Sequence, residues 1–400
     1  MKRLRDEDGQ TIILAALCMP LLLGFVALAV DAGLMFRAER EMQTAADSGA
    51  VAGAKELNFG DVTSAAKADT ARNGVTDGVN GAMVTVNNPP LSGPHAGNPY
   101  YVEVIVTKSQ ATFFMNVLNR SSMTVLGRAV AGQRPSGDCV YVLNPTASNA
   151  MNLQGSFDVS TPGCGVIVNS SSPNALQFTG SGGTLTAGSV GVTGGVGGQV
   201  GDSHPAPVTG IAPQSDPLSY VPPPSYNTPQ VPCGAVPSGS TIGPATSSGT
   251  VCYSGNVTLS NKTLKPGVYV FTGNVSFSGT VTGTGVTFYL LGGLDASNGT
   301  LNLSSPGSGT YNGMLIFASR TNSSQLTFDK GNASGTLSGI IYAPDSPMEL
   351  DDSGGDKNGG LSFTTDLIVN TLYDKTATLT ITSYSGSVNN SPLTRIAIVE

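Results

Sequence analysis

An uninterrupted apolar stretch near the start of the chain gives the first prediction. Residues 11–30 read TIILAALCMPLLLGFVALAV and contain no charged side chain. At about 1.5 Å per residue, a helix of this length matches a bilayer hydrocarbon core of about 30 Å. The pattern therefore predicts a transmembrane helix. Pro20 does not argue against it, because membrane helices tolerate proline.

Basic residues precede this stretch. Lys2, Arg3 and Arg5 lie before it, and cationic flanks remain on the cytoplasmic side of a membrane. We expect residues 1–10 to be cytoplasmic, residues 11–31 to span the membrane and the rest to be exported. A cleaved signal sequence is the alternative and would export the same residues. The apolar run is, however, longer than the usual signal core of roughly 7–15 residues.

After the span, apolar and small side chains recur at steps of three and four residues. Residues 31–57 are rich in Ala, Glu, Met and Arg, which favour helix, so the helix is expected to continue as an amphipathic rod. Two helices separated at Gly33 are the alternative. A second short helix is predicted over residues 61–73, where an aspartate can cap the first turn and glycine follows the last.

Alternating patterns then predict strands. Residues 100–107 read YYVEVIVT, with valines on one face, and residues 82–86 alternate more weakly. Residues 112–118 are expected to form an apolar turn of helix or a loop plug, and residues 122–133 are predicted to return as a strand. The pattern predicts a small α+β head over residues 32–134, rooted on the long helix.

From residue 135 the pattern changes to short apolar clusters separated by Gly, Ser, Asn and Thr. Such clusters, without a helical period between them, predict an all-β domain. We interpret it as a parallel β-helix or solenoid, in which each coil buries one face against its neighbours. The coils are expected in residues 135–201 and 251–400. Residues 202–250 are too rich in proline for a regular ladder and are predicted to form a strap across the solenoid.

Charge narrows the possible functions. Charged residues make up 11% of the chain, the formal net charge is −7, and no Lys or Arg occurs between Arg134 and Lys262. Cationic side chains bind phosphate backbones, so nucleic-acid binding through this region is excluded.

The cysteines divide into one in the predicted span, Cys18, and four in the exported part, Cys139, Cys164, Cys233 and Cys252. Oxidising conditions outside the cytoplasm favour disulfides among the four. Several pairings are possible, and proximity favours Cys139 with Cys164 and Cys233 with Cys252. A zinc site is the competing interpretation, but the chain has no CxxC pair and only two histidines.

The pattern of polar residues predicts no catalytic, cofactor or metal site. With two histidines, little is available for acid–base or triad chemistry, so the chain is predicted not to be an enzyme. An acidic cluster of Glu349, Asp351, Asp352 and Asp356 could bind calcium through its carboxylates. It lacks the spacing of a calcium-binding loop, and a solvated turn is the favoured interpretation.

The first third of the chain resembles a known family. The residues that carry the resemblance are Gly9-Gln10, Pro20, Gly24, Val30-Asp31-Ala32-Gly33 and Gln43-Thr44-Ala45-Ala46-Asp47-Ser48-Gly49-Ala50. With the strand, TFF and strand pattern that follows, they resemble the TadE/TadG-like family of tight-adherence (Flp) pilus-assembly proteins. Pilin-like relatives carry a glutamate where this chain has Leu14. The C-terminal part resembles Gly- and Thr-rich β-helical surface proteins.

The resemblance implies a non-enzymatic, membrane-anchored structural or assembly protein of a Flp-type pilus or adhesion system. It also implies the bacterial inner membrane as location, with a single span, a cytoplasmic N-terminus and a periplasmic bulk. Other pilus-assembly proteins are the implied partners. We expect partner contacts on the juxtamembrane helix at Met35, Met42, Ala45, Ala46 and Asp47. Packing against the chain's own head predicts the same pattern.

Two other functions stay open. One is a surface adhesin or polysaccharide-binding β-helix, with a surface polymer as ligand and an N-terminus that is only an anchor. A ladder of exposed Tyr or Phe would support it. The other is a polysaccharide-cleaving β-helix, which needs acidic residues or arginines clustered on one coil.

Overall fold

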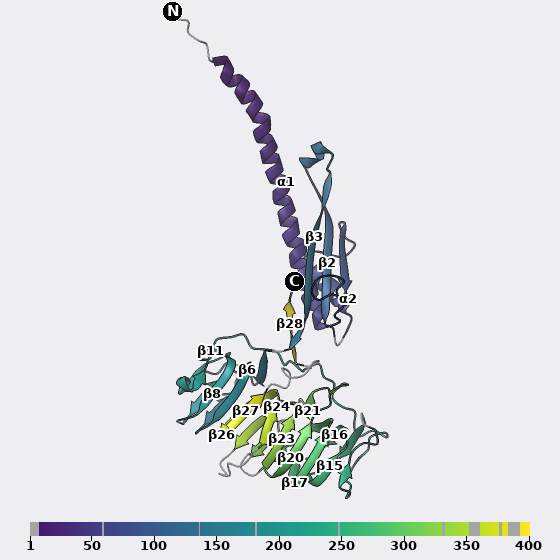
Figure 1. Cartoon of the computed structure of the whole chain (residues 1–400), viewed down its shortest axis with the longest axis vertical. Coiled ribbons are helices and arrows are strands. Elements are labelled where there is room, and N and C mark those ends of the chain that lie inside the picture. The colour runs from purple at the N-terminus through teal and green to yellow at the C-terminus, as the bar shows by residue number, and fades with distance from the viewer. Residues whose placement is uncertain are drawn as a thin grey trace, which may run out of the picture. The chain divides into compact units, whose positions relative to one another are not determined.

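The computed structural model describes residues 8–57, 60–135, 137–180, 182–246, 249–329, 333–351, 361–375, 378–382 and 393–400. The chain divides into two compact units (Figure 1). The first unit is Met1–Arg134 with Arg395–Glu400, and the second is Pro135–Thr394. The second unit is therefore inserted into the sequence of the first.

The first unit is built on one continuous helix, α1, Asp8–Lys55. It runs through Pro20 and Gly33 without a break, as the amphipathic continuation of the span predicts. The side chains from Leu14 to Val30 are largely exposed, and an eighteen-residue stretch of the helix has a mean hydropathy of 2.2. By length and composition, α1 can cross a membrane.

A second helix and a four-stranded sheet complete this unit. The elements are α2 Val62–Arg72, β1 Ala82–Asn87, β2 Tyr101–Ala111, the 3-10 helix η1 Met115–Leu118, β3 Ser122–Pro135 and β28 Thr394–Ile398. The strand order is β1-β2-β3-β28, and β2 pairs antiparallel with both β1 and β3. Asp61 caps α2 by accepting hydrogen bonds from the N–H groups of Thr63 and Ser64, as its position before the helical pattern predicts.

Alanines and valines form the core between α1, α2 and the sheet. The buried members are Ala38, Met42, Ala45, Ala46, Ala50, Ala54, Ala66, Val75, Ala82, Val84, Val102, Val104, Val106, Val125, Ala129 and Ala131. The alanines come mainly from the helices and the valines mainly from the strands. Small side chains on a helix let its backbone approach a sheet closely, so α1 lies flat on β2 and β3.

The second unit is all-β, as the sequence predicts. Its first strands are β4 Asp138–Val142, β5 Met151–Gln154, β6 Asp158–Val168, β7 Leu176–Thr179, β8 Thr184–Val192 and β9 Val196–Gly198, followed by the short helix η2 Val200–Asp202. Four two-residue strands follow: β10 Ser203–His204, β11 Val208–Thr209, β12 Cys233–Gly234 and β13 Thr241–Ile242. The remaining strands are β14 Thr250–Tyr253, β15 Val257–Leu264, β16 Gly267–Phe271, β17 Val275–Thr284, β18 Val286–Leu290, β19 Leu294–Ala296, β20 Gly299–Ser304, β21 Met314–Ala318, β22 Leu326–Asp329, β23 Ala333–Ser338, β24 Ile340–Asp351, β25 Leu361–Thr364, β26 Leu367–Lys375 and β27 Thr378–Thr382.

These strands pair in parallel with strands two or three further along, so equivalent side chains form columns. Tyr269 of β16 lies beside Phe288 of β18 in a column within the main hydrophobic core. On the opposite face, Tyr289, Phe317 and Tyr342 are neighbours in a second column, which belongs to a separate buried cluster. Strands buried on both faces have continuous apolar runs, which explains segments such as VTFYL in β18.

The two halves of this unit do not stack in sequence order. β26 pairs with β4 and β5, and β27 pairs with β6. The late strands therefore stack on the first ones, although sequence order alone predicts that they continue after residue 201. The proline-rich residues connect β11, which pairs with β8, to β12, which pairs with β14. Because the first and late strands are neighbours, a unit of this size can be inserted between β3 and β28.

Candidate functional site

The face of α1 that carries most of the predicted partner contacts packs on the chain's own sheet. Met42, Ala45 and Ala46 are buried in the head core, while Met35 and Asp47 are half-buried. The structure thus brings the five residues together and turns three of them away from the surface. A partner-contact role for the set stays a prediction.

Helix α1 approaches β3 closely at Gly127. A Cβ atom built on Gly127 would lie 2.4 Å from the backbone carbonyl carbon of Met42, so no side chain fits there. We expect Gly127→Ala to lower the free energy of unfolding of the head by about 1–3 kcal/mol, because the helix must shift away from the sheet. Hydrogen exchange of β2 and β3 in the full chain measures this. Gly33→Ala is the control, since its Cβ meets no atom within 4 Å; an equal loss in both variants would contradict the packing argument.

Gln43 covers the outer edge of β3. Its Nε2 donates to the carbonyl oxygen of Arg128 at 2.8 Å, and its Oε1 accepts from the Arg128 N–H at 3.2 Å. Asp47, one turn further along α1, accepts a second bond from Gln43 Nε2 at 2.7 Å and so orients the amide. Two residues along the same edge, the backbone of Val130 pairs with Val399 and Glu400. An open strand edge can pair with other chains. Here the Gln43 side chain and the backbone of Val399 and Glu400 occupy the edge of β3.

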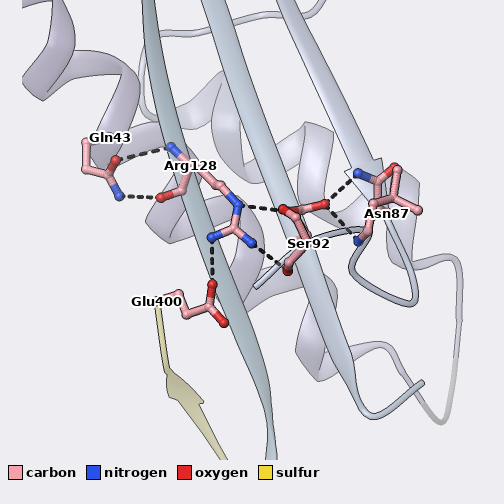
Figure 2. A network of polar contacts seen from close by, with 7 residues as sticks. Gln43, Asn87, Ser92, Arg128 and Glu400 are labelled. Carbon is pink, nitrogen blue, oxygen red and sulfur yellow. Dashed lines mark hydrogen bonds and ion pairs between the residues drawn. The ribbon is translucent and has the colours of Figure 1, made fainter. Parts of the chain in front are cut away.

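A network centred on Arg128 joins β2, β3 and the segment after β28 (Figure 2). Arg128 Nε donates to Glu103 Oε1 at 2.7 Å, and its Nη1 donates to Glu400 Oε2 at 2.6 Å. Its Nη2 donates to the carbonyl oxygen of Ser92 at 3.0 Å. The Glu103 side chain is fully buried, and the exposed fraction of Arg128 is 26%. This arginine therefore ties together segments that are far apart in the sequence.

Glu103 remains ionised within this network. Burial disfavours its charge, but hydrogen bonds from Asn87, the Leu91 N–H, Arg128 and Ser92 outweigh burial and hold the pKa of Glu103 below its ordinary value. The pKa of Arg128 is raised, above all by its hydrogen bond to Glu400. Both groups are thus charged at neutral pH, and the network is a structural ion pair in the head.

A second polar contact lies where the apolar part of α1 ends. The carboxylate of Asp31, which is 1% exposed, accepts backbone N–H bonds from Phe113, Phe114 and Met115 at 2.9, 2.9 and 2.7 Å. These three N–H groups lie at the start of η1, in the loop between β2 and β3. Asp31 thus fixes the end of the β2–β3 hairpin to α1, at the last residue of the predicted span.

In the second unit, the proline-rich strap is fixed by one arginine and one tyrosine. Arg320 Nη2 donates to the carbonyl oxygens of Leu218 and Val221, both at 2.8 Å, and its Nε donates to the Tyr342 hydroxyl at 2.7 Å. Tyr342 in turn donates to Asp216 Oδ2 at 2.6 Å. Burial and the neighbouring Asp216 carboxylate raise the pKa of Tyr342, so its hydroxyl stays protonated as a donor. Leu218 and Val221 are buried in the same cluster as the second column of Tyr289, Phe317 and Tyr342.

The structure contains the two disulfides that sequence proximity favours. Cys139 pairs with Cys164, joining β4 to β6, and Cys233 pairs with Cys252, joining β12 to β14. Each bond therefore connects neighbouring parallel strands. Cys18 is a free thiol exposed on α1.

The described residues contain no group of three or more His, Cys, Asp and Glu that could hold a metal ion. Two members of the predicted acidic cluster, Asp352 and Asp356, lie outside these residues. Of the other two, Glu349 accepts a hydrogen bond from Gln325, and Asp351 lies 3.5 Å from Lys375 Nζ. The solvated turn therefore stays a prediction.

Exposed aromatic residues are sparse where a polysaccharide-binding solenoid would display them. Among the described residues of the second unit, Tyr220 of the strap is the aromatic side chain that is exposed, at 36%. The aromatic rows at Tyr289, Phe317 and Tyr342 are buried instead. The described strands therefore add no support for a polymer-binding ladder.

Two parts of the chain match known families. Residues 9–56 match the model of the TadE/G-like Flp pilus-assembly family, and residues 232–375 match a domain of unknown function, DUF7305. No curated protein and no solved structure matches the chain. The first match confirms the resemblance of the N-terminal region. That region contains Asp31, Gln43 and Asp47, which make the contacts described above.

Proposed function

We propose that this chain is a non-enzymatic, membrane-anchored structural component of Flp-type pilus assembly. The observation that carries the proposal is the match of residues 9–56, which cover the exposed apolar half of α1 and the half that packs on the head. The family association gives the assembly system, and the apolar half of α1 provides the anchor. The bacterial inner membrane, with the head and the second unit on its periplasmic side, is part of the proposal.

The second unit is the exported surface of this component, and we propose that it is a parallel β-helix. Support comes from its parallel pairing, its stacked apolar columns and the two disulfides between neighbouring strands. A structure of this kind is stiff because each strand is bonded on both sides. It would present a long side surface to other components of the pilus. Adhesion is the alternative use of that surface.

Membrane fractionation with proteolysis of intact spheroplasts tests the anchor and its orientation. We expect the full chain to remain with membranes after alkaline extraction, and externally added proteinase K to digest everything beyond the span. Leu22→Arg combined with Val26→Arg is the control, because each charge in mid-span costs about 2.5–3.5 kcal/mol of insertion free energy. A soluble native chain that lacks the apolar stretch would overturn the anchor, and protection from external protease would overturn the orientation.

Photo-crosslinking tests the assembly association. A crosslinker at half-buried Met35 or Asp47 should capture other pilus-assembly proteins, whereas one at buried Met42 should capture none. Crosslinks at none of the three, in cells that assemble pili, would argue against the predicted contact face.

A further inference from the structure

The loop between β2 and β3 carries large apolar side chains that are exposed. We call residues 112–121 the tip loop. The exposed fractions are 67% for Phe113, 48% for Phe114 and 85% for Val117. Large exposed apolar side chains grouped on one loop mark a contact surface.

The position of the tip loop relative to α1 identifies what that surface meets. Asp31 is the first residue after the apolar stretch, and it holds the N–H groups of Phe113, Phe114 and Met115 at 2.7–2.9 Å. A bilayer is about 30 Å thick in its hydrocarbon core and about 40–45 Å with headgroups, which leaves about 6 Å of headgroup layer on each side. At about 1.5 Å per residue, that layer extends about four residues past Val30. The backbone of the tip loop is therefore at headgroup depth when α1 spans the membrane.

We propose that the tip loop is a second membrane contact, which inserts Phe113, Phe114 and Val117 into the outer headgroup and acyl boundary of the bilayer that α1 crosses. The proposal rests on the proposed anchoring of α1. Aromatic and aliphatic side chains are stable at this boundary, where they bury their apolar surface about 5–10 Å deep. Arg120, the charged residue of the tip loop, is exposed and suits anionic headgroups.

The geometry of α1 and the tip loop supports lipid as the occupant. The tip loop is continuous with the predicted membrane surface of α1. Asp31 follows the apolar stretch of α1 and also binds the backbone of the tip loop. Phe36, just over one turn further along α1, is 66% exposed as well. In Figure 1 the β2–β3 hairpin runs beside α1 and extends along it toward the apolar half. With two contacts in one bilayer, the head cannot swivel about the axis of α1.

The chain contains no Trp, so all tryptophan fluorescence comes from a single introduced tryptophan. We would place it in the full chain as Phe113→Trp, and at exposed Leu91 on the head as the control Leu91→Trp. Both proteins go into vesicles of phosphatidylethanolamine and phosphatidylglycerol. Lipids brominated next to the headgroup or near the bilayer centre then measure depth, and iodide measures access to water.

We expect Phe113→Trp to emit at shorter wavelength than Leu91→Trp, to be quenched severalfold more by shallow bromine than by deep bromine, and to be severalfold less accessible to iodide. When Asp31→Ala is added to Phe113→Trp, the emission wavelength, the quenching by bromine and the accessibility to iodide should all shift toward those of Leu91→Trp. Equal behaviour of the two tryptophans in vesicles that retain the protein would overturn the proposal. Protection of Phe113→Trp that disappears on dilution into excess lipid would also overturn it, and would identify a second copy as the occupant. Failure of the chain to float with vesicles would instead overturn the anchoring of α1.

Discussion

Arg128→Met should lower the free energy of unfolding of the head by about 3–5 kcal/mol, the largest loss we expect from a single substitution in this unit. Methionine retains the apolar volume of the side chain but removes all three donors. Glu103 is then a fully buried carboxylate without its cationic partner. Removal of one member of a buried ion pair is costly because the other charge stays in a medium of low dielectric constant.

Hydrogen exchange of peptides from β2 and β3, measured on the full chain in detergent, gives this free energy. The matched control is Arg72→Met. Arg72 also forms an ion pair, with Asp69 at 3.0 Å, but its exposed fraction is 77%. Exposed pairs contribute about 0–1 kcal/mol, so the control should stay close to the parent. A loss in Arg128→Met no larger than in Arg72→Met would show that the network is not a determinant of stability.

The pH dependence of the head should change with the same network. Glu103 has a lowered pKa in the folded chain, so its ionised form contributes stability above the unfolded pKa, and this contribution is lost as the pH falls through the folded pKa. In Glu103→Gln the corresponding part of the acid destabilisation should be absent. An unchanged acid profile in Glu103→Gln would assign the titration to other carboxylates.

The elements of the head could be predicted from local pattern, but the network could not. The period of α1, the cap at Asp61 and the alternation in β2 are each visible within a few residues. Glu103 also fits that alternation, and nothing beside it shows that it is buried. Its partner Arg128 is 25 residues away and Glu400 is 297 residues away. Contacts at such separations depend on tertiary packing, which a single sequence does not report.

The second unit illustrates the same limit in its topology. Short apolar runs predict an all-β domain, and the proline-rich residues predict a strap. Runs such as GVYVF also indicate burial on both faces, although they do not show which segments cover each face. The pairing of the late strand β26 with the early strand β4 leaves no local signal in the sequence. Any coil of this composition could stack on any other. The stacking order, unlike the strap, therefore depends on the strand register.

Arg320→Met should release the strap and raise the rate of chymotrypsin cleavage after Tyr220 by about two orders of magnitude. The substitution removes the donors to the Leu218 and Val221 carbonyls and to the Tyr342 hydroxyl. Hydrogen bonds to a charged group contribute about 1.5–3 kcal/mol each, and they are lost together here. A factor of ten in the open population corresponds to about 1.4 kcal/mol, so even half of the summed loss exposes the strap about a hundredfold more often.

Non-reducing gel electrophoresis can follow this cleavage, because neither disulfide crosses Tyr220. Cys139 and Cys164 both precede it, and Cys233 and Cys252 both follow it, so a cut chain separates into two fragments. Trypsin provides the internal reference, since the strap contains neither Lys nor Arg.

Two variants make the test specific to the hydrogen bonds of Arg320. Lys262→Met is the matched control, because Lys262 also donates to strap carbonyls, at residues 237–239, but on an exposed site far along the chain from Tyr220. It should leave cleavage at Tyr220 nearly unchanged. Arg320→Lys retains the charge without the planar fork and should lie between the parent and Arg320→Met. Equal cleavage in the parent and Arg320→Met would mean that burial of Leu218 and Val221 holds the strap without the arginine. Since those two side chains lie on the buried aromatic column, Leu218→Ala would then become the decisive variant.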